Sequence, residues 1–160
     1  MRNVLIVYKS KHNTTKQYAQ WIHEEVESTL IDVDYLLRDD LKDFDIIVFG
    51  SWIFDDTIMI ASHIEKYWEI LQYKRVILFC DGLTHPQDEK MNWIYEKSIP
   101  KHIRDNIYFY PLGGELSFQS ISFFEKLILK FKNKFREAHQ IDKLAIKPIL
   151  LKIYNLKVIE

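Results

Sequence analysis

Hydroxyl side chains gather in the loop that follows the first apolar run of the chain. The run Val4–Tyr8 is followed by Lys-Ser-Lys-His-Asn-Thr-Thr, which brings Ser10, Thr14 and Thr15 to the start of a helical pattern. Hydroxyl groups and the N–H groups of a first helical turn can donate to phosphate oxygens. The helix dipole adds about half a positive charge at that end. We therefore predict a phosphate site here, in preference to simple helix capping by Ser and Thr.

Other polar residues are weaker candidates for chemistry. The adjacent carboxylates Asp55 and Asp56 are a candidate acid–base pair, but we expect them to cap a helix that begins near Thr57. The six histidines lack the spacing of metal ligands, so we expect no metal site. We expect the single cysteine, Cys80, to be a small buried hydrophobe. No catalytic acid, base or nucleophile is assigned.

Length and composition fit one globular domain. The chain has 160 residues, and its formal net charge of −1 gives no overall field that would attract nucleic acid. A single cysteine excludes an internal disulfide and is typical of a reducing compartment. We find no signal-peptide layout and no apolar run near the roughly 18 residues of a membrane span. These features predict a cytoplasmic protein.

Short apolar runs alternate with longer helical patterns along the chain. The expected strands are Val4–Tyr8, Ile31–Leu37, Asp45–Gly50, Arg75–Cys80 and Ile107–Leu112. The expected helices are Thr15–Glu27, a segment from Ile60 to Leu71, Gln87–Glu96 and a segment from Phe124 to Phe135. This alternation predicts an α/β fold, a doubly wound parallel sheet of five strands with helices on both faces. Ligands of such folds bind beyond the carboxyl ends of the strands.

Two of the loops at those ends resemble loops of the flavodoxin family. Residues 10–15 are similar to its hydroxyl-rich phosphate loop, Ser/Thr-x-Thr-Gly-x-Thr, with His12 at a Thr position and Asn13 at the Gly position. Asn suits a left-handed backbone best after Gly. Residues 50–54 resemble the Gly-Ser-Pro-Ile-Tyr segment, with Trp52 at the Pro position and Phe54 at the aromatic that packs on the flavin ring.

The later part of the chain narrows the resemblance. Residues 112–116, Leu-Gly-Gly-Glu-Leu, and residues 123–127, Phe-Phe-Glu-Lys-Leu, are similar to the branch that includes the menaquinone-dependent protoporphyrinogen oxidases. The resemblance covers about residues 3 to 136 and implies the sheet order 2-1-3-4-5 with bound FMN. We expect residues 1–137 to form the FMN-binding domain. Residues 138–160 are expected to form a helical C-terminal extension packed on it.

The expected cofactor-binding residues come from three loops. They are Ser10, Lys11, His12, Asn13, Thr14, Thr15, Ser51, Trp52, Ile53, Phe54, Asp81, Gly82 and Leu83. His85 and Trp93 are weaker candidates for the far wall of the pocket. If Asp55 or Asp56 lies near the flavin, its charge would lower the potential of the second electron.

Several functions fit this resemblance. The first is an oxidoreductase of the protoporphyrinogen-oxidase type, and the second is a one-electron carrier that serves a partner protein. Carriers of this family tend to be strongly acidic, so the nearly neutral charge favours the enzyme. A flavodoxin-like interaction module that has lost FMN is the third. A receiver domain is rejected, because Lys9-Ser10 and Gly50-Ser51 stand where its acidic residues would be.

The expected partners follow from these functions. They are a redox partner protein or a quinone, and no nucleic acid. The basic segment Lys126–Arg136 is a weak candidate for contact with a membrane surface, since such charge runs more often form a solvated helix face.

Overall fold

A parallel sheet of five strands forms the centre of the protein. The computed structural model describes residues 2–82, 89–113 and 141–159. The parallel strands are β1 (Val4–Lys9), β2 (Thr29–Asp32), β3 (Ile46–Phe54), β5 (Arg75–Gly82) and β6 (Ile107–Gly113). Their order is β2-β1-β3-β5-β6, and the short strand β4 (Thr57–Ile58) pairs only with the end of β3. With β4 set apart as a hairpin strand, the order is the predicted 2-1-3-4-5, and the fold class is confirmed.

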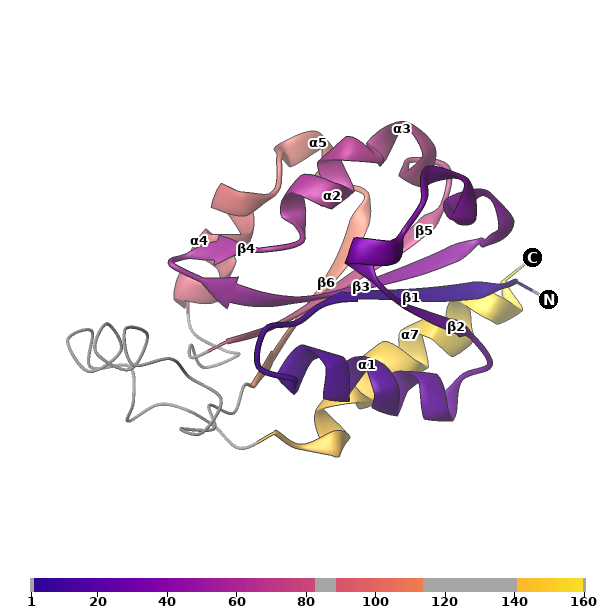
Figure 1. The fold of residues 1–160 in the computed structure, drawn as a ribbon, viewed down its shortest axis with the longest axis horizontal. Helices are drawn as coiled ribbons and strands as arrows, with labels where there is room; N and C mark the ends of the chain where they lie inside the picture. The colour runs from indigo at the N-terminus through magenta and orange to yellow at the C-terminus, as the bar shows by residue number, and fades with distance from the viewer. Residues whose placement is uncertain (1, 83–88, 114–140, 160) are drawn as a thin grey trace.

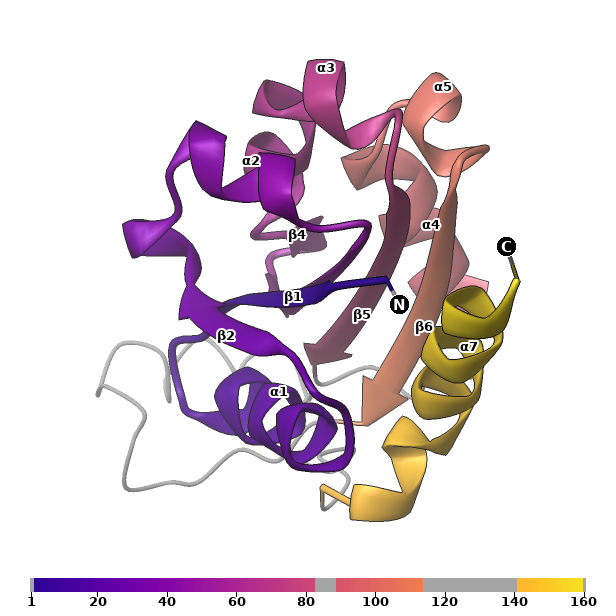
Figure 2. The same cartoon turned by 90° about the vertical axis from the view of Figure 1, so that its right-hand side faces the viewer.

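Helices cover both faces of the sheet (Figures 1 and 2). On one face lie α1 (Thr14–Glu25) and α7 (Lys147–Val158). On the other face lie α2 (Ala61–Lys66), α3 (Trp68–Leu71), α4 (Glu89–Ser98) and α5 (Lys101–Arg104). The described residues also form the 3-10 turns η1 (Val33–Tyr35), η2 (Arg38–Asp43) and η4 (Lys143–Ile146).

The strands are apolar on both sides because each side meets a helix layer. In β1, Leu5 and Val7 pack with the α2 layer, whereas Ile6 packs with α1 and α7. This follows from the two-residue repeat of a strand, which points successive side chains to opposite faces. A side chain at position 50 would displace Phe79, because a Cβ there would lie 2.2 Å from the ring of Phe79. The same two-residue repeat determines which residues at the strand ends lie on the same face of the sheet.

Two of the predicted elements differ from the structure. The predicted strand Ile31–Leu37 is wrong beyond Asp32, because the Asp32 side chain accepts the Asp34 N–H at 3.0 Å and starts the turn η1. The predicted helix from Ile60 to Leu71 is divided at Tyr67 into α2 and α3. Helix α4 ends at Ser98 before Pro100, as predicted. The predicted helix from Phe124 to Phe135, with the basic segment Lys126–Arg136, lies outside the described residues.

Helix α7 is part of the core of the described structure. Its Ile149, Ile153 and Leu156 are buried against the face of the sheet that α1 also covers. The Tyr154 hydroxyl donates to the carbonyl of Glu25 at the end of α1, at 2.8 Å. The division of the chain at residue 137 stays a prediction. Within the described residues, every helix is too short or too polar to cross a membrane.

Candidate functional site

The first loop turns into α1 through a left-handed residue. Asn13 has φ 64° and ψ −8° and is the N-cap of α1. Its side chain makes no capping hydrogen bond, and the first turn of α1 contains no acidic residue. Asn13 therefore takes the backbone role expected of the family's glycine, and its side chain does not cap the helix. Lys11 and Asn13 are exposed, and Thr14 opens the helix.

Ser10 carries a buried hydroxyl that lacks a protein partner. Its Oγ is buried and makes no hydrogen bond with any described residue. A buried hydroxyl without a partner costs free energy, on the order of 1–3 kcal/mol. A phosphate oxygen beside the N-terminus of α1 would supply the missing acceptor. The residues present at this end of the site therefore fit a phosphate monoester.

Thr15 uses its hydroxyl within the protein. It donates to Oδ1 of Asp81, at the end of β5, with 2.5 Å between the two oxygens. Both residues are buried, with 1% and 4% of their surfaces exposed. Burial raises the pKa of Asp81 to about 7, and the hydrogen bond from Thr15 opposes this shift. The predicted donation from Thr15 to phosphate therefore competes with Asp81.

Aromatic side chains of β3 contact the first loop. The rings of Trp52 and Phe54 lie 5.4 Å apart, and His12 meets Trp52 edge to face at 6.2 Å. The Lys11 ammonium lies 5.5 Å from the centre of the Trp52 ring and 5.8 Å from that of Phe54. Phe54 is 42% exposed, so this cluster still offers apolar surface to a flat ring. Residues 52 and 54 share the sheet face of α1, as does residue 81, whose side chain bonds to Thr15 of α1.

Ser51 points away from the predicted phosphate site. It is fully buried on the α2 face, where its hydroxyl donates to the Trp52 carbonyl and accepts the Ile60 N–H. Strand parity explains this, because residue 51 alternates with residues 50 and 52. Ile53 packs on that same face and covers Gly82, where a Cβ would lie 3.2 Å from the Ile53 Cβ. The hydroxyl of Ser51 therefore supports the backbone of the loop.

The remaining candidates lie on or after β5. Leu83 and His85 lie outside the described residues. Trp93 is half-exposed on α4, and the Lys97 ammonium lies 5.2 Å from the centre of its ring.

Asp55 and Asp56 form the turn of a hairpin. The predicted cap of a helix near Thr57 is wrong, because β3 and β4 pair antiparallel around these two residues. Both have left-handed backbones, with φ 47° and 58°, which a two-residue hairpin loop requires. Helix α2 begins only at Ala61. Asp56 forms an ion pair with Lys90 of α4 at 3.0 Å. Asp55 and Asp56 thus form the turn that follows β3, the strand of Trp52 and Phe54, and do not cap a helix.

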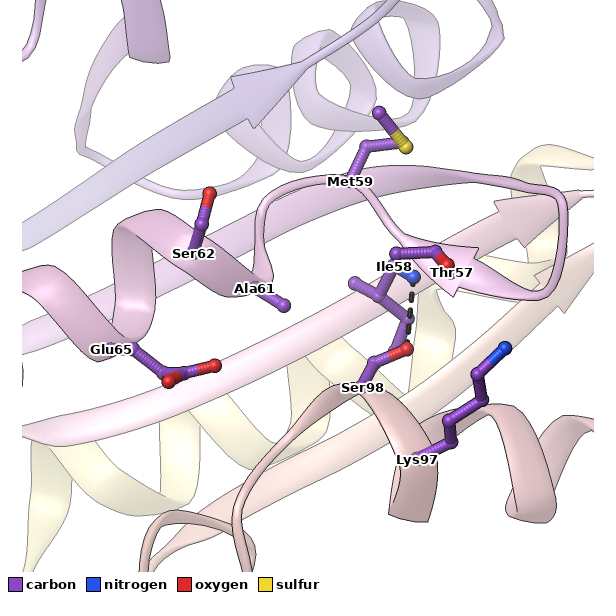
Figure 3. A pocket seen from close by; sticks show the side chains of 8 residues that line it. All are labelled: Thr57, Ile58, Met59, Ala61, Ser62, Glu65, Lys97 and Ser98. Carbon is purple, nitrogen blue, oxygen red and sulfur yellow. Dashed lines mark hydrogen bonds between the residues drawn. The ribbon is translucent and has the colours of Figure 1, made fainter.

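A separate shallow pocket lies beside the hairpin (Figure 3). It has a volume of about 360 Å³ and opens between β4, α2 and the end of α4. The Ser98 hydroxyl in its wall accepts the Ile58 N–H at 3.0 Å, and Glu65 and Lys97 stand on opposite sides of it in Figure 3. The Ser98 hydroxyl is thus used to join the hairpin to α4, and the Thr57 hydroxyl donates to the Asp55 carbonyl within the turn.

Among the described residues, no cluster is suited to a metal, and the one cysteine is not suited to act as a nucleophile. No group of three His, Cys, Asp or Glu side chains is placed to bind a metal within them. Cys80 is fully buried, and burial raises the pKa of its thiol. It therefore stays protonated near neutral pH and is a poor nucleophile.

Sequence reasoning missed two polar contacts that shape the site. One is the Thr15–Asp81 hydrogen bond. The other is the Tyr18 hydroxyl, which donates to the Gly113 carbonyl at the end of β6, at 2.7 Å. Strand parity was the available signal, because it places residue 81 on the face of Phe79, under α1. Both contacts fix α1 to the carboxyl ends of the strands.

Comparisons with known proteins agree with this architecture. A model of the flavodoxin domain family matches residues 5–142. A search of curated proteins found no match. Three solved structures share the fold at low sequence identity. A flavodoxin of Megasphaera elsdenii is 16% identical, with a TM-score of 0.51 over 68% of this chain and 84% of its own.

The other two structures match more of the chain. The Trp repressor binding protein of Bacillus subtilis is 13% identical, with a TM-score of 0.51 over 88% of this chain and 100% of its own. An NAD(P)H:quinone oxidoreductase of Methanothermobacter marburgensis is 12% identical, with a TM-score of 0.50 over 88% and 98%. Such low identities show the fold alone. The family match extends over most of the sequence, and the chain therefore belongs to the flavodoxin domain family.

Proposed function

We propose that this protein binds FMN non-covalently and acts as a flavin-dependent redox protein. The observation that carries the proposal is the buried Ser10 hydroxyl without a described partner, beside the N-terminus of α1, which the Asn13 side chain leaves uncapped. Trp52 and Phe54 contact the same loop and offer aromatic surface next to it. A phosphate site beside aromatic rings matches the two ends of FMN.

The chain's own residues hold and orient the cofactor in this proposal. Ser10 and the first turn of α1 bind the phosphate, and Trp52 and Phe54 support the ring. FMN, when bound, supplies the electron or hydride transfer. The described part of the site assigns no catalytic acid or base to the protein. The protein then controls access to the ring and tunes its potential.

We favour an oxidoreductase over an electron carrier. The net charge of −1 provides no strong acidic field for docking of a reductase. A quinone oxidoreductase is among the proteins that share the fold. We propose a quinone or a redox protein as the electron partner, and a protoporphyrinogen-type substrate on the resemblance of residues 112–127 alone. The carrier and an interaction module without FMN are the rival functions.

Titration with FMN tests the proposal directly. We expect quenching of flavin fluorescence that saturates at one FMN per chain. Ser10→Ala should weaken FMN binding about tenfold, equivalent to about 1.4 kcal/mol for a lost hydrogen bond to a charged group. Riboflavin, which lacks the phosphate, should bind equally to both proteins. Ser62→Ala, on the exposed side of α2, is the matched control. A folded protein that does not bind added FMN would refute the proposal and favour the interaction module.

Turnover assays separate the enzyme from the carrier. The FMN-loaded protein is mixed with protoporphyrinogen and a soluble menaquinone analogue. Oxidation of the porphyrinogen over many cycles supports the enzyme. Reduction of the protein by a flavodoxin reductase, with no oxidation of protoporphyrinogen, supports the carrier.

A further inference from the structure

Asp81 is a buried acid below the predicted phosphate site. It lies at the carboxyl end of β5, between Trp52 of β3 and Leu112 of β6. Only 4% of its surface is exposed, and its carboxyl accepts the hydroxyl proton of Thr15 in the first turn of α1. An acid is unfavourable so close to a phosphate, because the two negative charges repel. Its role at this position therefore needs an explanation.

We propose that Asp81 is a positioning residue that couples the binding of the FMN phosphate to the uptake of one proton. The inference rests on the proposed function. When phosphate binds, the Asp81 carboxylate takes a proton from solvent. The neutral acid then donates to Oγ of Thr15, and the Thr15 hydroxyl proton turns from Asp81 to a phosphate oxygen. One proton enters the site: an O–H bond of the solvent donor breaks, the O–H bond of the Asp81 carboxyl forms, and the other covalent bonds of the protein and of FMN are unchanged.

The hydrogen-bonding capacity of the two groups supports this exchange. A hydroxyl has one proton to donate, and an ionised carboxylate can only accept. While Asp81 is ionised, it therefore holds the single proton of Thr15. The oxygens are 2.5 Å apart, a distance that serves donation in either direction. Protonation of Asp81 both releases the Thr15 donor and removes the opposing charge.

The surroundings of Asp81 leave it as the group that titrates. The titratable groups coupled to it among the described residues are the Tyr18 phenol of α1 and the Cys80 thiol of β5, whose pKa values are both raised. Both are neutral near pH 7. No described cation is among the causes of the shifted Asp81 pKa, which burial raises to about 7. The bound phosphate would raise it further.

The coupling predicts how the affinity for FMN depends on pH. Above pH 7 the empty site carries ionised Asp81 and the loaded site carries the neutral acid, so binding takes up a proton. The dissociation constant of FMN then increases by up to about tenfold per pH unit. The second pKa of a phosphate monoester is about 6, so the ligand itself stays dianionic in this range. Riboflavin has no phosphate and should show no such dependence.

Calorimetry of the full-length protein tests the coupling. FMN is titrated at pH 7.5, 8 and 8.5 (chosen to lie above about 7) in pairs of buffers with different ionisation enthalpies. We expect an uptake that approaches one proton per FMN, and none with riboflavin. Binding of FMN without proton uptake and with a constant affinity would overturn the inference and leave the proposed function intact. Absence of FMN binding at every pH would overturn both.

Substitutions identify the group responsible. Asp81→Asn should bind FMN with the same affinity throughout this pH range and without proton uptake. Asp43→Asn, the same change on the exposed turn η2, should behave as the native protein. Thr15→Ser should keep the affinity for FMN. Thr15→Val should bind FMN about tenfold more weakly and riboflavin with unchanged affinity. Equal losses for FMN and riboflavin in Thr15→Val would show a merely structural role. Should Asp81→Asn not fold, the proton uptake of the native protein still decides.

Discussion

The two ends of the candidate site are built in different ways. The phosphate end, formed by Ser10, Thr15 and Asp81, is buried and polar and stands on a strand end and a helix start. The ring end, formed by Trp52 and Phe54, is aromatic and partly exposed and stands on a hairpin. Both ends lie on the α1 side of the sheet.

The difference indicates a division of labour in the proposed function. Hydrogen-bonding groups in a buried site are strong when satisfied and costly when they are not. The phosphate end is therefore suited to recognition of the FMN phosphate. Its unsatisfied polar groups lower the stability of the protein while the phosphate end is empty. The exposed ring end gives an electron partner access.

Asp81→Asn should stabilise the FMN-free protein at pH 8. The pKa of Asp81 is about 7 in the folded protein and 3.8 ordinarily, so as the pH rises Asp81 loses its proton at a lower pH in the unfolded chain than in the folded protein. The free energy of unfolding therefore falls between pH 4 and pH 7, by about 4 kcal/mol at most. Asparagine cannot ionise and should recover much of this loss at pH 8. Urea unfolding of both proteins at several pH values measures it.

The pH dependence provides the control for this prediction. At pH 4 the native protein carries a neutral Asp81, so the advantage of Asp81→Asn should nearly disappear. If Asp81→Asn stabilises the protein equally at pH 4 and pH 8, the gain comes from packing. Ionisation of Asp81 would then not be what destabilises the FMN-free protein.

The sequence predicted the parallel sheet because its signals are local. Apolar runs such as Val4–Tyr8 identify strands that are buried on both faces, and the polar loop at 10–15 leads into the predicted start of a helix. Asn13 was correctly matched to a position that needs a left-handed backbone. These features depend on a few neighbouring residues, and the structure keeps them.

Features that depend on tertiary contacts were not predicted. Asp55 and Asp56 suit both a helix cap and a two-residue turn, and the pairing of β3 with β4 selects the turn. The hydroxyls of Ser51 and Thr15 find partners 9 and 66 residues away, which no local pattern specifies. Strand parity could have given the side of the sheet for residues 51 and 81, but not the partner of either side chain.

Trp52→Ala should weaken the binding of FMN and of riboflavin by the same factor. The substitution removes aromatic support for the ring and leaves the phosphate end unchanged, so we expect about a tenfold loss for each, or about 1.4 kcal/mol. Fluorescence titration measures both constants. Ser10→Ala should instead change the ratio of the dissociation constants of FMN and riboflavin. Tyr73→Ala, at a side chain that is 83% exposed after α3, is the control. A change in the FMN-to-riboflavin ratio for Trp52→Ala would contradict the separation of the two ends.

The hairpin carboxylates should give the smallest effect, on the potential of the second electron. Their charges would repel the negative charge of the reduced cofactor, so removing one should raise this potential. Asp55→Asn and Asp56→Asn both retain a residue that tolerates a left-handed backbone. An exposed charge interaction is worth about 0.5 kcal/mol, which corresponds to a shift on the order of 20 mV.

Lys90 already opposes the charge of Asp56 at 3.0 Å, which limits the rise in potential expected for Asp56→Asn. Spectroelectrochemical titration of the FMN-loaded proteins, with Asp43→Asn as the distant control, measures both shifts. Equal potentials in all four proteins would show that the hairpin charges do not act on the ring. The Lys11 ammonium of the first loop, 5.5 Å from the centre of the Trp52 ring, would then be the charged group to replace next.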